Sequence, residues 1–421
     1  MIPLDQAKAI AVDSIEVGTS VQLPLSEAHA RFLAEPLRAP RSLPNFDNSA
    51  MDGYALRSAD TAGANRDRPA RIQVVEIIYA GARPQRALGQ AQAARIFTGA
   101  PLPQGADCVV RQEATRAEND RVLVFVEARP HSNVRRKGEE LAQGDAVFAA
   151  GQRLDASALG VLASLGLESA AVWSQPTVAI LTLGDELVAP GNAAQEHQTY
   201  NSNAALLAAL SMEAGAQVTT LEHAADRESA VRRAIERLIS SCDLLITSGG
   251  ASVGDKDLIK QALRSLGAAT IFDGVAIKPG KPAGVSVLGG HPVAILPGNP
   301  GAAAVAFDQL ARPMLLKRQG VIEARQRLAV RLGSPQHKQG GLTYLLSAKL
   351  ERDEAGKPTA RIRPQGSGQL LQNVGADGWV LLPPGRADFA VGEEATMELF
   401  RGASFSPARS SVGRVASRAG A

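Results

Sequence analysis

Residues 242–267 read CDLLITSGGASVGDKDLIKQALRSLG, and this stretch decides the fold class. Its first apolar run predicts a buried strand, the glycines and small hydroxyls predict a turn, and the apolar period that follows predicts a helix. Glycines let the backbone approach a ligand closely, and the start of a helix offers unpaired N–H groups that suit phosphate. Read alone, the turn fits a phosphate cradle, a metal site at its acids, or only a connection from strand to helix.

The same alternation of strands with helices runs through residues 175–325. Alternation of this kind is typical of a parallel sheet that helices cover on both faces. On either side, residues 46–140 and 326–402 instead alternate short β-like runs with Gly/Pro turns. The sequence therefore predicts a multidomain α/β plus β fold, with a parallel-rich central α/β domain, β-rich front domains and a C-terminal β barrel or sandwich.

The composition shifts also predict where the domains divide. We expect a helical linking domain at 1–45 and 141–174, a β-rich domain at 46–140, the α/β domain at 175–325, a C-terminal β domain at 326–402, and a disordered tail at 403–421.

The composition argues against several classes of protein. Aromatic residues make up 4% of the 421 residues and the net charge is only +3, so we expect no nucleic-acid partner. No apolar run approaches the roughly 18 residues that span a membrane, and the N-terminus lacks the apolar core of a signal peptide. Cys108 and Cys242 lie beside apolar runs without CxxC spacing. These features predict buried reduced thiols and a cytoplasmic protein.

Three loops of the α/β domain follow predicted strands, and ligands of such sheets bind at the carboxyl ends of the strands. Asp185, Glu186, Asp255 and Asp257 lie in or just after these loops, and Mg²⁺ favours carboxylates beside substrate phosphates. The alternatives are that the loops are only tight turns and that Asp185 and Asp255 are helix caps. The loops are TLGDEL (182–187), SGGASVGDKD (248–257) and LPGNPGAAA (296–304).

Two further sets of residues could bind anions or orient a substrate. Lys278 and Lys281 flank a stiff Pro-Gly turn in AIKPGKPAG (276–284), which suits a phosphate or an oxyanion such as molybdate, or is only a solvated basic turn. In the front half, polar turns occur in DNSAMDGYA (47–55), TGAPLPQGAD (98–107) and RRKGEELAQGD (135–145). The sequence contains neither GxxxxGK[ST] nor a GxGxxG after a first strand, which argues against P-loop and dinucleotide enzymes.

Seven motifs in order along the chain resemble those of the molybdopterin molybdenumtransferase (MoeA) family, which includes the E domain of gephyrin. The resemblance covers about residue 4 to about residue 400. The motifs are LPNFDNSAMDGYAL, IFTGAPLPQGADCVVRQE, VRRKGEEL, LTLGDEL, SGGASVGDKD, AIKPGKPAG and LPGNPGAAAVAF.

The resemblance implies an enzyme of molybdenum cofactor biosynthesis that inserts molybdate into adenylylated molybdopterin and releases AMP, with Mg²⁺ as the divalent cation. It also implies a homodimer whose active site lies between the α/β domain of one subunit and the front domains of the other. Transient contacts with a molybdopterin adenylyltransferase and with acceptor molybdoenzymes are further expectations.

The resemblance carries functional roles onto matching positions of this sequence. The catalytic candidates are Asp52, Thr98, Glu186, Asp257 and Lys278, of which Glu186 and Asp257 are the metal ligands and Asp52 and Thr98 come from the other subunit. The substrate-binding candidates are Asp226, Ser248, Gly249, Gly250, Ser252, Lys281, Pro297, Gly298, Asn299, Pro300, Ser367, Glu139 and Glu140.

The sequence departs from the family at three positions. Glu140 stands where Asp is usual, and Leu346 lies nearest to a position that often holds arginine. A lysine sometimes found before the Pro-Gly turn is replaced around residues 273–274. These changes predict that the protein binds the anion more weakly or through different contacts. Two other functions stay open: a molybdopterin adenylyltransferase, whose stand-alone domains lack the front motifs, and a non-catalytic scaffold, which would not need Glu186 and Asp257.

Overall fold

The computed structural model describes residues 1–250, 257–364, 366–400, 402 and 404–407. Contacts divide the chain into two compact units, each described below by itself. The first comprises Met1–Glu35, Ala150–Ala156 and Ser169–Ala421, and the second comprises Pro36–Ala149 and Ser157–Glu168. The finer four-domain division stays a prediction.

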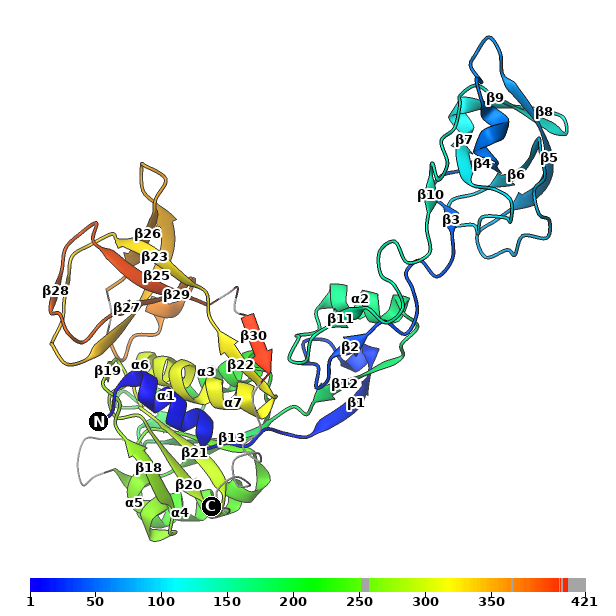
Figure 1. Cartoon of the computed structure of the whole chain (residues 1–421). Helices are drawn as coiled ribbons and strands as arrows, with labels where there is room; N and C mark the ends of the chain where they lie inside the picture. The colour runs from blue at the N-terminus through cyan, green and yellow to red at the C-terminus, as the bar shows by residue number, and fades with distance from the viewer. Residues whose placement is uncertain (251–256, 365, 401, 403, 408–421) are drawn as a thin grey trace, which may run out of the picture. The chain divides into compact units, whose positions relative to one another are not determined.

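The centre of the first unit is a six-stranded sheet (Figure 1), and the parallel pairing of most of its strands agrees with the sequence prediction. In sheet order the strands are β16 (Gln217–Ala224), β13 (Thr177–Leu183), β17 (Leu244–Ser248), β21 (His291–Leu296), β20 (Gly284–Leu288) and β18 (Ala269–Asp273). The pairings among its first four strands are parallel, whereas β20 pairs antiparallel with both β21 and β18.

Helices cover both faces of this sheet, and strand β13 shows why. Its side chains point alternately to opposite faces, as they must in a strand. Val178 and Ile180 pack in a cluster with α1, α3, α6 and α7, whereas Ala179 and Leu181 pack with α4 and α5. The helices are α1 (Leu4–Asp13), α3 (Ser202–Glu213), α4 (Glu228–Leu238), α5 (Leu258–Ser265), α6 (Pro300–Ala306) and α7 (Arg312–Arg318), with a π-helical turn (Phe307–Ala311) between the last two.

The C-terminal part of the first unit is a closed five-stranded barrel, which decides between the two predicted alternatives. The strands pair in the order β25, β26, β23, β29 and β27, and β27 pairs back to β25. The short strand β19 (Ile277–Lys278) joins this barrel, since it pairs in parallel with β25. The barrel strands are β23 (Arg327–Leu332), β25 (Thr343–Arg352), β26 (Pro358–Ile362), β27 (Gly378–Leu382) and β29 (Glu394–Leu399).

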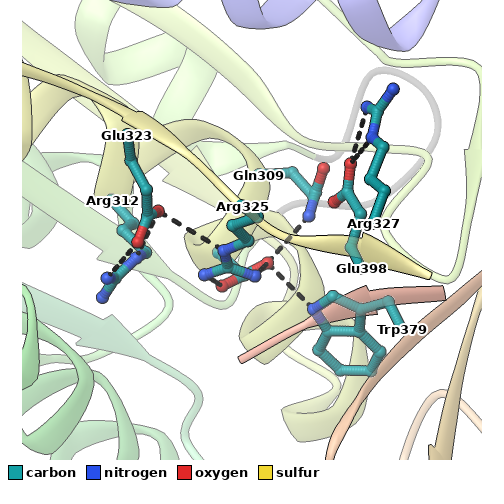
Figure 2. Close-up of polar contacts among 8 residues, drawn as sticks. Gln309, Arg312, Glu323, Arg325, Arg327, Trp379 and Glu398 are labelled. Carbon is teal, nitrogen blue, oxygen red and sulfur yellow. Dashed lines mark hydrogen bonds and ion pairs between the residues drawn. The ribbon is translucent and has the colours of Figure 1, made fainter. Parts of the chain in front are cut away.

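A buried polar network joins the α/β part to the barrel (Figure 2). At its centre the Asp308 carboxylate, in the π-helical turn, accepts two hydrogen bonds from the Arg325 guanidinium, at 2.5 and 2.8 Å. The same carboxylate accepts from the indole nitrogen of Trp379 in β27, at 2.8 Å. Because Arg325 lies in the connector into the barrel, these contacts fix the barrel against the helices.

A strand forms where the sequence predicts a disordered tail. β30 (Ser404–Pro407) pairs antiparallel with β22 (Val321–Ala324). Residues 403 and 408–421, the rest of that predicted tail, lie outside the described residues. The remaining two-stranded pairs of this unit are β1 (Ser20–Pro24) with β12 (Ser169–Trp173), β14 (Leu187–Val188) with β15 (Thr199–Tyr200), and β24 (Gln336–His337) with β28 (Asp388–Phe389).

The second unit is β-rich, as predicted, and apolar clusters pack against its six-stranded sheet. The sheet order is β7 (Cys108–Arg111), β4 (Gly53–Leu56), β6 (Gln92–Ile96), β5 (Ala70–Ile78), β9 (Arg121–Val124) and β8 (Thr115–Glu118). Smaller elements are β2 (Leu37–Arg38) with β11 (Ala146–Phe148), β3 (Asn48–Ser49) with β10 (Val134–Arg135), and most of α2 (Ala156–Ser164).

Both thiols are buried and free, as predicted. Burial raises the pKa of Cys108 to about 12 and that of Cys242 to about 11, so neither is a reactive thiolate near neutral pH. Among the helices of the described residues, none has the length and apolar character needed to cross a membrane.

Candidate functional site

A cavity of about 1040 Å³ lies where the parallel strands β13, β17 and β21 end. This is the edge of an α/β sheet at which ligands bind. All three loops singled out in the sequence contribute to its wall. Of the predicted site residues, the cavity brings together Glu186, Asp226, Ser248, Gly249, Gly250, Pro297, Gly298, Asn299 and Pro300.

The turn after β17 requires a glycine at position 249. Gly249 has φ +94°, a conformation that side chains disfavour. A Cβ atom there would lie 2.2 Å from the backbone oxygen of Leu183. The turn is therefore held against the end of β13, and no side chain can be accommodated between them.

Replacing Gly249 with alanine is expected to lower the free energy of unfolding by at least about 2 kcal/mol, because backbone strain and a carbonyl clash act together. Gly267 is a matched control, since it has φ +84° but no neighbour within 4 Å of the added Cβ. We expect Gly267→Ala to cost only about 1 kcal/mol. Urea unfolding of both variants measures the difference, and equal losses would show that the clash contributes nothing.

Asn203 ties the loops of the cavity together, and the sequence did not single it out. Its side-chain nitrogen donates to the Ser248 hydroxyl at 2.8 Å and to the backbone oxygen of Gly298 at 2.7 Å. The Ser248 hydroxyl in turn donates to the backbone oxygen of Pro297 at 2.9 Å. One buried amide thus holds the loops after β17 and β21 in register. The NSN run at the start of α3 was the sequence feature that could have identified Asn203, which is its second asparagine.

Two acids that line the cavity, Glu186 and Asp226, are exposed. The Glu186 side chain is exposed and folds back over Gly184, where an added Cβ would lie 2.8 Å from either carboxylate oxygen. Asp226 and Asp185 cap each other: the Asp226 amide donates to the Asp185 carboxylate at 3.0 Å, and the Asp185 amide donates back at 3.4 Å. Asp185 is therefore part of a loop–loop contact and not the helix cap that the sequence allowed.

Asp257 is buried and is the N-cap of α5, where its side chain accepts from the Lys260 amide at 3.1 Å. This corrects the expectation that the neighbouring Asp255 caps the helix; Asp255 and the predicted site residue Ser252 lie outside the described residues. The Lys260 ammonium pairs with Asp257 at 2.9 Å and with Asp273 at 2.5 Å. Burial alone would lower the pKa of Lys260, but its bonds to Asp273 and Asp257 raise it.

The carboxylates of this site could hold a magnesium ion only if a substrate supplied further ligands to it. Within the described ranges, no three His, Cys, Asp or Glu side chains form a group that could hold a metal ion alone. Mg²⁺ needs one or two carboxylates when phosphates and water complete its shell. Glu186 and Asp226 share one cavity and fit that requirement, whereas a helix amide and a lysine already engage the Asp257 carboxylate.

A second, basic cavity of about 950 Å³ shares Pro282, Pro297 and Asn299 with the first. We refer to it as the basic cavity. Its wall comes from the Pro-Gly turn on one side and from the barrel on the other. No Asp or Glu occurs among its lining residues, taken from the described part of the chain. Its basic side chains are Lys278, Lys281, His337, Lys338 and Arg363.

Pairing of β19 with the barrel places the predicted residue Lys278 in the basic cavity. Lys278 lies opposite Tyr344 of β25, and its ammonium nitrogen is 5.3 Å from the centre of that ring. Lys281 also lines the cavity. So does Leu346, which means that the position nearest the family's usual arginine presents an apolar side chain to this cavity.

Ser367 is the barrel residue that meets the loop after β21. Its hydroxyl accepts from the Asn299 side chain at 3.0 Å, and its backbone oxygen accepts from the Ala302 amide at 3.1 Å. Ser367 and Asn299 both line the basic cavity. These bonds link the predicted residue Ser367 to the LPGNP run in the loop after β21.

The remaining predicted residues belong to the second unit. Asp52 accepts from both the amide and the hydroxyl of Thr98, each at 2.8 Å, and the Thr98 amide is the main cause that lowers the pKa of Asp52. Glu139 accepts from the Arg136 amide at 2.8 Å, and the Glu140 amide donates to Leu43 at 3.1 Å. The structure thus joins Asp52 to Thr98, and the roles of all four residues stay predictions.

Three family models match consecutive parts of the chain. Residues 2–166 match the MoeA N-terminal region (domain I and II), residues 179–317 match a probable molybdopterin binding domain, and residues 329–400 match the MoeA C-terminal region (domain IV).

Relatives resemble the chain over nearly its whole length. A molybdopterin molybdenumtransferase of Haemophilus influenzae is 33% identical over 414 residues, which cover 95% of this chain and 99% of that protein. One of Nostoc sp. is 35% identical over 379 residues, covering 87% and 86%. The crystal structure of a molybdopterin biosynthesis moea protein from Pyrococcus horikosii has a TM-score of 0.81 at 31% identity, covering 96% and 100%. The chain therefore belongs to the molybdopterin molybdenumtransferase (MoeA) family of enzymes, which serve molybdenum cofactor biosynthesis.

Proposed function

We propose that the enzyme inserts molybdate into adenylylated molybdopterin and releases AMP in a reaction that needs Mg²⁺. The observation that carries this proposal is that a cavity with acids and glycine turns adjoins the basic cavity, whose described lining contains no acid, and shares three residues with it. The first suits a nucleotide phosphate with its cation, and the second suits a second, oxygen-rich anion. Both reactants of such a transfer would then lie side by side.

In the first cavity, the backbone turns at Gly249 and Gly298 would bind phosphate oxygens, and Asn203 would keep those turns in place. Glu186 and Asp226 would hold Mg²⁺ there. When bound, the ion would neutralise charge on the phosphate and polarise it.

In the basic cavity, Lys278 and Lys281 would bind molybdate oxygens as point charges. Ser367, whose hydroxyl is positioned by Asn299, would add one hydrogen bond. The absence of acids from the described wall keeps this cavity attractive to a dianion.

The reaction itself gives the direct test. Purified protein would be incubated with adenylylated molybdopterin, Mg²⁺ and molybdate, while AMP release and cofactor formation are followed. Adenylate that is bound but stays intact would exclude the proposed reaction and leave a binding scaffold. AMP formed only when ATP and molybdopterin replace the adenylate would instead indicate an adenylyltransferase.

Asp257→Asn separates a metal-binding role from the helix cap. Asparagine caps helices as well as aspartate does, and Lys260 keeps Asp273 when its mostly buried pair with Asp257 is lost, so we expect the free energy of unfolding to fall by roughly 1–3 kcal/mol. If Asp257 binds the metal, AMP release should fall by about 100-fold, because one anionic ligand is lost. Chemical denaturation and initial rates measure the two effects. Unchanged AMP release would remove Asp257 from the metal site.

We also infer a homodimer in the cytoplasm, in which Asp52 and Thr98 of one subunit serve the α/β domain of its partner. The support for the homodimer is the resemblance, and the Asp52–Thr98 contact shows only that these two side chains could act together. Sedimentation equilibrium tests the assembly, and a monomer at working concentration would contradict it. Contacts with an adenylyltransferase and with acceptor enzymes stay predictions.

A further inference from the structure

Lys338 is a buried cation in the wall of the basic cavity. It lies between β24 and the barrel strand β25, and only 2% of its surface is exposed. Its ammonium nitrogen donates to the backbone oxygen of Leu342 at 2.9 Å. One neutral carbonyl does not offset a full positive charge, and burial of an unpaired charge is costly.

A second lysine lies at the same aromatic ring. The ammonium nitrogens of Lys338 and Lys278 are each 5.3 Å from the centre of the Tyr344 ring. Lys278 comes from the Pro-Gly turn and Lys338 from the barrel, so the two charges approach the ring from different segments. The ring faces attract cations only modestly, by about 0.5–2 kcal/mol each.

The surroundings leave these two cations without a compensating anion in the cavity wall, since none of the described residues lining it is Asp or Glu. Burial accordingly lowers the pKa of Lys338 below its ordinary value. Arg363 is differently placed, because its guanidinium donates to the backbone oxygens of Leu371 and Val374 at 3.2 and 3.0 Å. It is thus engaged in holding the turn at residues 371–374.

We propose that Lys338 is a ligand for a tetrahedral oxyanion, which it binds together with Lys278 beside the Tyr344 ring. A dianion in this cavity would supply the countercharge that the protein wall lacks. The barrel would then provide a cation from Lys338, although Leu346 in the same wall is apolar. This inference rests on the proposed function, because it names a further contact for the molybdate of that reaction.

The simplest alternative is that Lys338 only ties its own loop to Leu342. Lys338→Gln addresses this, because glutamine keeps an N–H donor but has no charge, and Lys338→Arg keeps the charge. Lys338→Met removes both charge and donor. Lys349→Met is the matched control, since Lys349 is an exposed lysine on the barrel strand β25.

Equilibrium dialysis of the full chain against molybdate measures binding without the transfer reaction, and phosphate serves as a second probe. We expect Lys338→Gln and Lys338→Met to weaken molybdate binding by about 10- to 100-fold, as loss of one charge-assisted contact does. Lys338→Arg should stay within about 5-fold of the unchanged protein, and Lys349→Met should not change. Thermal unfolding identifies any variant that fails to fold. If one neutral variant is poorly folded, molybdate binding is compared between Lys338→Arg and the better-folded neutral variant.

Several outcomes would overturn the inference: unchanged affinity in a folded neutral variant, an equal loss in Lys349→Met, or no oxyanion binding by the unchanged protein. If the unchanged protein still released AMP from the adenylate in that last case, the proposed function would survive while the Lys338 site would not. Phosphate bound as tightly as molybdate, with the same dependence on Lys338, would support the oxyanion site and assign it to a substrate phosphate.

Discussion

Replacement of Asp308 with alanine is expected to lower the free energy of unfolding by about 3–5 kcal/mol, the cost typical of breaking a buried ion pair on one side. Arg325 would lose its bidentate partner while it stays buried, with only a weaker contact to Glu323 at 3.3 Å (Figure 2). Burial alone would lower the pKa of Arg325, but Asp308 raises it, so the charge persists at any ordinary pH. Trp379 and Gln309 would each lose an acceptor as well.

The Arg361–Glu351 pair gives a matched control on the barrel surface. Its side chains are 59% and 41% exposed, so Glu351→Ala should change stability by no more than about 1 kcal/mol. Trp379→Phe removes the indole donor to Asp308 together with part of a buried ring, and should cost roughly 1–3 kcal/mol. Urea unfolding measures all three variants. A loss below about 1 kcal/mol for Asp308→Ala would mean that the network does not stabilise the junction between helices and barrel.

Replacement of Glu186 with glutamine is expected to reduce AMP release by about 100-fold or more, equivalent to roughly 3 kcal/mol of transition-state stabilisation. The change keeps the size of the side chain and removes the charge that would hold Mg²⁺ against the adenylate. Because the Glu186 side chain is exposed, the free energy of unfolding should stay within about 0.5 kcal/mol.

Glu196→Gln is the control for this experiment. Glu196 is exposed on the segment between β14 and β15 and does not line the cavity. Its rate should equal that of the unchanged protein. Initial rates at several Mg²⁺ concentrations add a second readout, since a lost metal ligand should raise the Mg²⁺ concentration needed for half-maximal rate. A normal rate and a normal Mg²⁺ requirement would remove Glu186 from the metal site.

Local sequence patterns predicted much of the central fold. The apolar runs that became β13 and β17 are buried along most of their length, and the loops after them line one cavity, as expected for parallel strands. Asn201 caps α3 as its residue type suggests, with its side chain accepting from Ala204 at 3.2 Å. Such features depend on a few neighbours in the chain, so a single sequence displays them.

The sequence alone could not decide between two residues that suit the same role equally well. Both Asp255 and Asp257 suit a helix start, and the structure assigns the cap to Asp257, whose side chain also pairs with Lys260. The pairing of Ser404–Pro407 with β22 was missed because its partner lies some eighty residues earlier in the chain. Asn203 was missed because its role depends on two hydrogen bonds to loops that lie far from it in the sequence.

The sequence by itself determined the family, the α/β plus β fold and the loops that carry the candidate site, because these follow from local periodicity and from long motifs. Only the tertiary structure decided which loops share a wall. It joined the Pro-Gly turn to the barrel through β19, placed Lys338 and Lys278 at one tyrosine ring, and buried Asp308 with Arg325. The physical reason is that burial and charge pairing depend on segments far apart in sequence, whose approach is fixed by packing of the whole unit.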